Sequence, residues 1–348
     1  MKIAYILPSL KNNGPIVVVK NLVEILTDLG HEIDVYYFDK TSLVMKFDCS
    51  VKHISFNIPI DFDLYDIVHS HCFRPDLYVY KWKKRIHKAK IISTLHQDTY
   101  HCFRDRYNSL LAHIFTSYWC YIHSKFDYVI SISDCLREAY KDKIKSPMIT
   151  IHNGCAVTLN SMIDLSIIDK LQQIRKIYKI LGTYAFVVPC KGLSQVIKTL
   201  PYLLDYAFVI IGEGPDIENL KKISQNLNVS DRVFFFPYQK YPCNYLSYFD
   251  VYVMPSYSEG FGMSMVEAAL AQKSIVCSDI PVFHEIFVDK KEAHFFVLDN
   301  IKSLESAILS AYEFKESFGK AAFSKANRDF TTWKMAKNYE AFCKQIIY

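Results

Sequence analysis

Residues 251–268 read VYVMPSYSEGFGMSMVEA. Val251–Met254 is a short hydrophobic run typical of a buried strand, and the apolar spacing of Met263–Ala271 predicts a helix. The loop between them contains Gly260 and Gly262, and glycine allows the backbone to approach a ligand closely. The free amides at the start of a helix favour an anion. The stretch therefore predicts a strand, loop and helix of a parallel α/β fold, with an anion site in the loop.

Two glutamates flank these glycines, Glu259 before them and Glu267 about one turn into the helix. A carboxylate accepts two hydrogen bonds, which suits a ribose diol, and we expect Glu267 to fill that role. Phosphates would repel Glu259, so we expect it to lie over sugar hydroxyls. One such glutamate alone is most simply a solvated side chain. The pair, with Gly-x-Gly between its members at a strand-to-helix junction, favours a binding site.

The same alternation runs along the whole chain. Ile3–Leu7 reads as a strand, a polar loop with Gly14 follows, a helical pattern ends at Gly30, and Glu32–Phe38 reads as the next strand. Further strands are expected in two series, at 67–69, 91–94, 128–132 and 148–151, and then at 180–186, 208–211, 233–236, 251–254 and 274–277. The sequence predicts two successive doubly wound α/β domains.

The spacing Glu259 … Glu267 resembles the E-x7-E motif of retaining glycosyltransferases with the GT-B fold, and glycosyltransferase family 4 in particular. The resemblance covers nearly the whole chain. Its other parts are short motifs in the family's usual order, namely Gly30-His31-Glu32, Asn153-Gly154, Pro189-Cys190-Lys191-Gly192, Gly212-Glu213-Gly214-Pro215, Asp231–Phe235 and Phe249-Asp250-Val251. Each motif is weak alone, whereas the combination is specific.

This resemblance implies two Rossmann-like, doubly wound domains that face a central cleft. Residues 1–160 would form the acceptor domain and residues 161–328 the nucleotide-sugar donor domain, with 329–348 as a helix that crosses back to the first. The implied reaction moves a sugar from a UDP- or GDP-sugar to an acceptor hydroxyl with retention of configuration. The acceptor would be a glycan or a lipid-linked intermediate of O-antigen, lipopolysaccharide or capsule type.

The implied site residues are few. Lys191 would bind the donor pyrophosphate, and a full charge at a helix start suits that role. The amides of Gly260, Phe261, Gly262 and Met263 would assist it, with Gly14 and Gly212 close to the donor. His96 follows the strand at 91–94 and resembles the family's histidine that contacts the transferred sugar, so Glu259, Lys191 and His96 form the expected catalytic set.

The sequence departs from the family's pattern in two places. The family usually has an arginine about five residues before the lysine, where this chain has Tyr184-Ala185-Phe186. Either Lys191 and the loop amides bind the donor, or another cation substitutes. The first loop usually has adjacent glycines, where this chain has Asn12-Asn13-Gly14, and asparagine tolerates a left-handed backbone.

No metal and no cofactor are expected. The string Asp61-Phe62-Asp63 resembles a metal-binding D-x-D but lies away from the donor motifs, so it is interpreted as a loop. His69 and His71 follow another strand of the first domain and are interpreted as structural.

The formal net charge is +5, and six cations lie within the ten residues 81–90, four of them in the run Lys81–Arg85 with Trp82 among them. Such a mixture suits an anionic membrane surface, whereas a nearly neutral remainder argues against nucleic acid. A solvated helix face is the alternative. The ten cysteines contain no C-x-x-C pair and no leader precedes the first strand, so we expect reduced thiols in the cytoplasm, with peripheral attachment to the inner membrane face left open.

Two other functions remain open at this stage. A UDP-sugar 2-epimerase of the same fold would need additional acid or base groups near the donor. A non-catalytic subunit would have lost donor binding, which the missing arginine and the altered first loop suggest.

Overall fold

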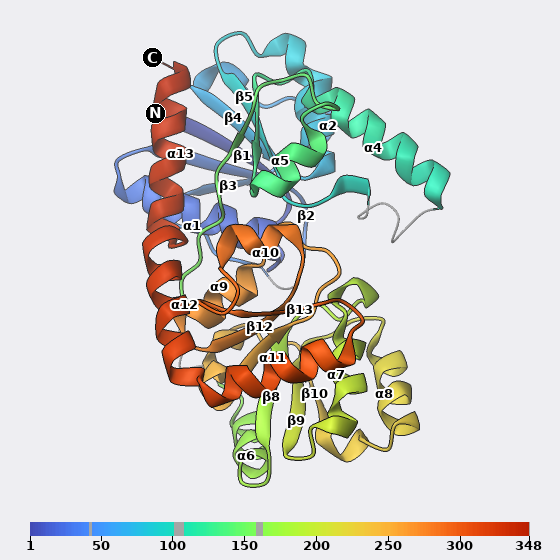
Figure 1. Cartoon of the computed structure of the whole chain (residues 1–348). Helices are drawn as coiled ribbons and strands as arrows, with labels where there is room; N and C mark the ends of the chain where they lie inside the picture. The colour runs from blue at the N-terminus through green and yellow to red at the C-terminus, as the bar shows by residue number, and fades with distance from the viewer. Residues whose placement is uncertain (42–43, 101–107, 158–162, 348) are drawn as a thin grey trace. The chain divides into compact units, whose positions relative to one another are not determined.

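The computed structural model describes residues 1–41, 44–100, 108–157 and 163–347. Contacts divide the chain into two compact units (Figure 1). Unit 1 comprises Met1–Gly154 and Thr331–Tyr348, and unit 2 comprises Cys155–Phe330. The expected boundary between residues 160 and 161 falls in a segment outside the described residues, and the contacts divide the chain a few residues earlier.

Unit 1 contains a seven-stranded sheet in the order β3-β2-β1-β4-β5-β6-β7, and every neighbouring pair is parallel. The strands are β1 (Lys2–Ser9), β2 (Glu32–Asp39), β3 (Ser50–His53), β4 (Ile67–His71), β5 (Lys90–Leu95), β6 (Tyr128–Ser131) and β7 (Met148–Thr150). The helices are α1 (Gly14–Asp28), α2 (Phe73–Trp82), α4 (Ser109–His123), α5 (Asp134–Tyr140) and α13 (Thr332–Ile347).

The strand order reverses beside β1. From β1 the chain proceeds outward to β2 and β3, whereas β4 lies on the other side of β1 and leads outward to β5, β6 and β7. Right-handed crossovers in opposite directions place the intervening helices on opposite faces of the sheet. The carboxyl ends of β1 and β4 therefore form a switch point, where ligands of open α/β sheets bind.

The C-terminal helix α13 packs against α1 and so belongs to unit 1. His31 Nε2 lies 3.1 Å from Glu340 Oε1, and both side chains are buried. Hydrogen bonds from Lys337, Lys344 and His31 lower the pKa of Glu340 to about 2. These contacts fix residues distant in sequence to the same unit.

Unit 2 contains a six-stranded parallel sheet in the order β10-β9-β8-β11-β12-β13. The strands are β8 (Lys179–Tyr184), β9 (Tyr206–Ile211), β10 (Val233–Phe236), β11 (Val251–Met254), β12 (Ser274–Ser278) and β13 (His294–Phe296). The helices are α6 (Leu165–Arg175), α7 (Leu193–Thr199), α8 (Ile217–Asn226), α9 (Met263–Leu270), α10 (Pro281–Ile286), α11 (Ile301–Glu313) and α12 (Lys315–Asp329). Here the switch point lies between β8 and β11.

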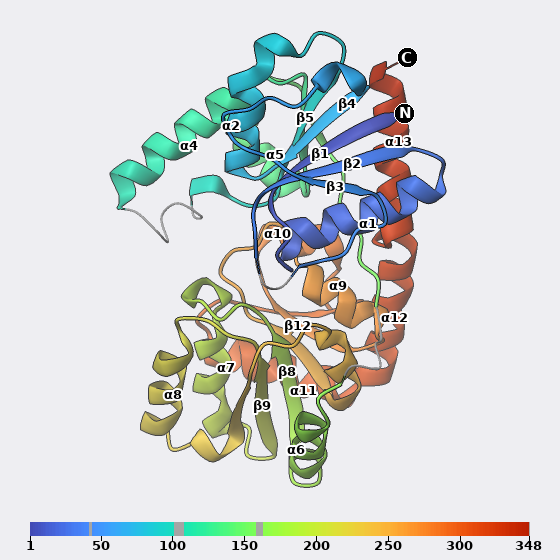
Figure 2. The same ribbon diagram turned by 180° about the vertical axis from the view of Figure 1, so that it is seen from behind.

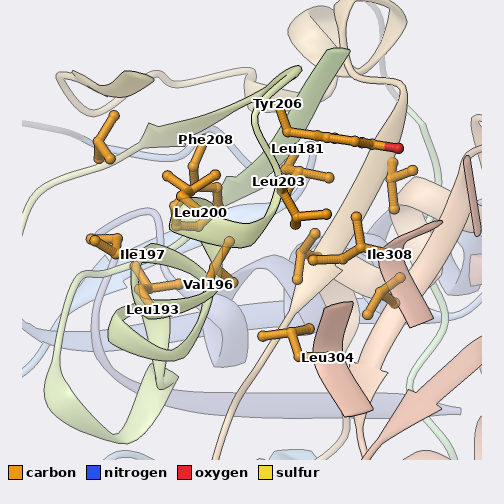
Figure 3. Close-up of a cluster of buried hydrophobic side chains, with 14 of the residues drawn as sticks. Leu181, Leu193, Val196, Ile197, Leu200, Leu203, Tyr206, Phe208, Leu304 and Ile308 are labelled. Carbon is orange, nitrogen blue, oxygen red and sulfur yellow. The ribbon is translucent and has the colours of Figure 1, made fainter. Parts of the chain in front are cut away.

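Aliphatic side chains from α7, α11 and the sheet fill the core on one face of unit 2 (Figure 3). Val196, Ile197 and Ile308 have no exposed surface, and they pack with Leu181 of β8 and Phe208 of β9. This core holds the central strands β8 and β11 in place, and so it determines where the loops after these strands begin.

The expected fold class is confirmed, because both units are parallel, doubly wound α/β structures. All eleven strands expected from the sequence are present, with ends shifted by up to two residues. Two strands were missed, β3 and β13. Every residue of β3 is exposed, so it has no hydrophobic pattern.

Candidate functional site

Two loops of unit 2 begin at neighbouring strand ends. β8 ends at Tyr184 and β11 ends at Met254, and the two strands pair in parallel through Val251 and Leu181. The loop after β8 leads to Lys191, and the loop after β11 leads to Glu259 and the start of α9. The topology thus brings the expected donor motifs to the switch point of unit 2.

A set of close contacts joins these loops. Gly192 has φ of +63°, and a Cβ at this position would lie 2.0 Å from the carbonyl oxygen of Pro255, so only glycine fits. The buried Gln195 donates from Nε2 to the same oxygen at 2.8 Å, and the amide of Tyr257 donates to Cys190 at 2.8 Å. The loop after β8, which contains Lys191, is therefore packed against the loop after β11.

Lys191 and Glu259 form an ion pair across this junction. Lys191 Nζ lies 2.6 Å from Glu259 Oε1, and the hydroxyl of Ser256 donates to the same oxygen at 2.7 Å. The side chains are 25% and 11% exposed. Burial alone would lower the pKa of Lys191, but the charge and hydrogen bond of Glu259 outweigh it and the pKa is raised. Lys191 is therefore fully protonated at neutral pH.

Glu267 has a different partner. The hydroxyl of Tyr184 donates to Glu267 Oε2 at 2.6 Å from the end of β8, and Tyr184 itself is buried. Burial raises the pKa of Glu267, while hydrogen bonds from Tyr184 and Cys243 act in the opposite direction. The carboxylate is half-buried and oriented by a phenol, as suits a group that receives hydrogen bonds from a ligand.

The glycine loop between the two glutamates turns directly into α9. Gly262 has φ of +114°, which a residue with a side chain rarely adopts, and it caps the helix that begins at Met263. Phe261 is buried, and its ring meets that of Phe330 edge to face. Residues 260–263 could therefore act on a ligand through their backbone, since the Phe261 side chain belongs to the core.

In the motif Gly212-Glu213-Gly214-Pro215, which follows β9, both glycines are required by close packing. Gly212 has φ of +148°, and a Cβ there would lie 1.9 Å from the carbonyl oxygen of Ala185. Gly214 lies equally close to Val187. Phe186, in the stretch where the family usually has its arginine, is 66% exposed. The loop after β9 thus supports the loop after β8.

In unit 1 the first loop leads directly into α1. Asn13 has extended backbone angles (φ −150°), and its side chain caps α1 by accepting from the amide of Ile16, so the left-handed conformation that asparagine tolerates is not adopted by this residue. Gly14 is the first residue of α1, and among the described residues nothing lies within 4 Å of a Cβ built there. The fold itself therefore leaves open space at Gly14.

Three histidines meet at the carboxyl ends of β4 and β5. His96 follows β5 and is half-buried, and its Nε2 lies 2.7 Å from Nδ1 of the fully buried His71. His69 is also buried, with its Nε2 2.8 Å from the hydroxyl of Thr94. Burial lowers the pKa of His96 to about 4 and that of His69 to about 3, so both rings are neutral at pH 7. His71, which was interpreted from the sequence as structural, thus contacts the candidate site residue His96.

The remaining candidates lie elsewhere in unit 1. Asp63 accepts hydrogen bonds from the amides of His87 and Lys88, at 3.0 and 3.3 Å, which is a structural role within a short 3-10 helix at Phe62–Leu64. The basic run continues from α2 and is exposed at Lys81 and at residues 83–85. Lys81 and Arg85 lie over the ring of Trp82, at 5.1 and 5.2 Å from its centroid.

Family comparisons agree with this arrangement. Residues 12–158 match the model described as Glycosyltransferase Family 4, and residues 167–326 match that described as Glycosyl transferases group 1. This chain is a glycosyltransferase of the family 4 type. The glycosyltransferase is 29% identical to the O-antigen biosynthesis glycosyltransferase WclY of Escherichia coli over 98% of its own length and 97% of the relative's.

Other relatives of the glycosyltransferase are more distant. It is 25% identical to phosphatidyl-myo-inositol mannosyltransferase of Mycolicibacterium smegmatis over 65% of its own length and 57% of the relative's. Its fold matches Anabaena HepE, solved in complex with UDP and glucose, with a TM-score of 0.82 and 16% identity over 99% of both chains. The structural likeness supports the GT-B fold assignment.

Three residues with a role in this arrangement were not identified from the sequence, namely Tyr184, Gln195 and His71. Tyr184 had a weak signal, since it lies near the end of a predicted strand, in the stretch where the family's arginine is missing. Gln195 and His71 gave no signal of a role at the site, because their contacts depend on loops and strands that meet only in the fold.

Proposed function

We propose that this glycosyltransferase is a retaining enzyme that uses a UDP-sugar and modifies a glycan or lipid-linked acceptor in the assembly of a surface polysaccharide. The ion pair of Lys191 with Glu259, at the switch point of unit 2, is the observation that carries the proposal. UDP is favoured because HepE, which shares the fold, was solved with that nucleotide. O-antigen-type acceptors are favoured by the relative WclY.

In the proposed reaction, the bond between the anomeric carbon and the diphosphate oxygen breaks as the acceptor oxygen bonds on the same face. The sugar passes through a state resembling an oxocarbenium ion. The acceptor proton moves to the departing phosphate oxygen, which gains negative charge. Lys191 and the amides at the start of α9 stabilise that charge in the proposed mechanism.

Glu259 acts in this proposal as the partner that keeps Lys191 extended. The single oxygen Oε1 of Glu259 is bonded to both Lys191 and Ser256. When a diphosphate arrives, Lys191 can turn to it while the carboxylate keeps Ser256 and can accept from sugar hydroxyls. In the complex with donor, the charge of Lys191 thus acts on the diphosphate, and the carboxylate of Glu259 accepts hydrogen bonds from the sugar.

The first prediction concerns metal and stereochemistry. Because Lys191 supplies the positive charge at the leaving group, transfer should proceed at full rate in excess EDTA and keep the anomeric configuration of the donor. Proton NMR of the product formed from UDP-sugar candidates in EDTA measures both. Activity that disappears in EDTA and returns with Mg²⁺ or Mn²⁺, or an inverted product, contradicts the proposal.

The second prediction concerns Glu267. Changing it to alanine should weaken UDP binding by about 1–3 kcal/mol, the usual cost of leaving a buried hydrogen-bonding group without its partner. Calorimetric titration with UDP measures this. Tyr184→Phe is the matched control, because it removes the phenol that orients Glu267 and leaves the carboxylate, so its loss should be smaller. A folded Glu267→Ala protein with unchanged affinity shows that this carboxylate does not bind the nucleotide.

A membrane surface is the proposed location of the acceptor. α4 carries exposed apolar side chains that repeat along one face, Leu110 (70% exposed), Ile114 (53%), Tyr118 (42%) and Tyr121 (47%). α4 packs beside α2, as both views show (Figures 1 and 2). The basic run lies at the end of α2, and an apolar helix face beside cations suits the interface of an anionic bilayer. Among the described residues, no helix has the length and apolar composition needed to span a bilayer.

The third prediction follows from that surface. Replacing the four cations by glutamine should release the protein from anionic vesicles, because each is worth about 1 kcal/mol near such a surface. The residues are Lys81, Lys83, Lys84 and Arg85. Vesicle sedimentation at low and high salt measures the effect, with four exposed lysines of unit 2 changed as the control. If the wild-type protein does not sediment with anionic vesicles at low salt, the proposal that this surface binds a membrane is wrong.

The alternatives have their own tests. Calorimetry with UDP and with GDP separates an enzyme from a subunit that has lost donor binding, because such a subunit binds neither. Conversion of a UDP-sugar to its 2-epimer without acceptor would identify an epimerase instead.

A further inference from the structure

Two histidine rings of unit 1 share one hydrogen bond. His71 Nδ1 and His96 Nε2 lie 2.7 Å apart, with ring centroids 5.0 Å apart. A neutral imidazole carries one proton, on one of its two nitrogens. The contact therefore has a direction, because one of the facing nitrogens donates and the other accepts.

Both rings are neutral at the pH of a cell. Burial lowers the pKa of His71 well below its usual value, with smaller contributions from His69 and His96, and burial lowers the pKa of His96 to about 4. Each ring thus has a single proton to place.

The far side of His71 decides the direction. His71 is fully buried, and its Nε2 has no hydrogen-bond partner among the described residues. If His96 donated, neutral His71 would carry its proton on Nε2, as a buried N–H with no acceptor. Such orphaned donors are rare in folded proteins, whereas an unpaired acceptor is tolerated more often. The lone pair therefore belongs on Nε2 of His71 and the proton on Nδ1.

We infer that His71 donates from Nδ1 to Nε2 of His96 and so holds His96 in the tautomer that carries its proton on Nδ1. The hydrogen bond of one ring nitrogen sets the state of the other. His96 then offers a ligand an N–H donor and has no free ring acceptor. His71 acts through His96 and is a positioning residue.

This arrangement defines what His96 recognises. An N–H donor binds an oxygen lone pair, such as that of a sugar hydroxyl, and rejects a group that can only donate. That the ligand is the transferred sugar rests on the proposed function, whereas the tautomer does not. His69 helps to hold the ring of His71, at 4.3 Å between centroids, while its own Nε2 is occupied by Thr94.

Long-range proton–nitrogen NMR of protein labelled with ¹⁵N-histidine distinguishes the two tautomers directly, without any ligand. Signals are assigned from His71→Gln and His96→Gln spectra. We expect His71 and His96 both to show the Nδ1–H pattern at neutral pH. An Nε2–H pattern for either ring overturns the inference.

Variants at His71 extend the test. His71→Leu removes the donor, so the His96 signal should lose its pure Nδ1–H pattern. His71→Asn places an amide near the former Nδ1 and should restore that pattern. His69→Leu is the matched control, because it removes a neighbouring buried histidine and should leave the His96 tautomer unchanged. A His96 pattern that stays Nδ1–H in a folded His71→Leu protein contradicts the role of His71.

The tautomer of His96 and its contact with the sugar can be tested separately. A changed tautomer in His71→Leu with unchanged sugar transfer supports the present inference and contradicts the proposed contact of His96 with the sugar. If His71→Leu does not fold, the wild-type spectrum alone decides the tautomer.

Discussion

Lys191→Ala is expected to lower the turnover of sugar transfer by at least about a hundredfold, the usual effect of removing a main electrostatic stabiliser. The neighbouring strand end offers no second cation, because it reads Tyr184-Ala185-Phe186 and Phe186 is exposed. Arg232 is buried and its guanidinium donates to the carbonyls of Leu200, Leu203 and Tyr206, so it serves the fold. Steady-state kinetics with the donor found by screening measures the loss.

The ion pair with Glu259 requires a control, because removing Lys191 also leaves a carboxylate uncompensated beside the diphosphate. The double variant Lys191→Ala, Glu259→Gln removes that repulsion. If Lys191 only neutralised Glu259, the double variant would regain most activity, and we expect it to stay about a hundredfold below wild type. Lys191→Arg should recover part of the rate, since guanidinium is longer and differently directed. Phe186→Arg should tighten UDP binding if the missing arginine belongs there.

The free energy of unfolding is expected to fall steeply when the pH drops from about 8 to about 5. An unfolded histidine takes up a proton near pH 6.5, whereas folded His69 does so only at about pH 3. Between these values the unfolded state binds more protons, so the stability contributed by neutral His69 is present above pH 6.5 and is lost as the pH falls. At pH 5 the loss from His69 alone amounts to about 2 kcal/mol.

Urea unfolding at the two pH values, for wild type and for His69→Gln, isolates this contribution. Glutamine has no titrating group and can place its amide near Thr94, the present partner of His69 Nε2. The variant should lose about 2 kcal/mol less than wild type between pH 8 and pH 5, because every other group titrates in both proteins. Equal losses in the two proteins would show that His69 is not held neutral by the fold.

The sequence was sufficient for the fold because both sheets are parallel and buried, so their strands appear as hydrophobic runs between helical patterns. It failed at β3, where edge position and full exposure leave no pattern, and at the short strand β13. It also gave no sign that Asn13 caps α1, because that role depends on where the helix begins. The hydrophobic pattern of a segment therefore predicts which strands are buried, but it does not predict the conformation of the loops.

The spacing of the motifs indicates where the candidate site lies, but it does not indicate which side chains pair with each other. Lys191 and Glu259 are 68 positions apart in the chain, and Tyr184 and Glu267 are 83 apart. Nothing local distinguishes a lysine that faces a phosphate from one that first meets a carboxylate. His71 shows the same limit, since its hydrogen bond to His96 joins the ends of two neighbouring strands.

The chain passes between the units at two points, after Gly154 and after Phe330, and within each unit the two residues at these points contact each other. The amide of Cys155 donates to Phe330 at 2.8 Å within unit 2, and Gly154 is packed so tightly on Thr331 in unit 1 that a Cβ would lie 2.2 Å from its carbonyl oxygen. Unit 2 is thus an uninterrupted segment whose two ends are hydrogen-bonded to each other, while unit 1 is assembled from both flanks. During synthesis, unit 1 cannot be completed before α13 has been made, although its first strands are made before any part of unit 2. In evolutionary terms, a segment with adjoining ends is an exchangeable cassette, which can be replaced without stretching the host domain.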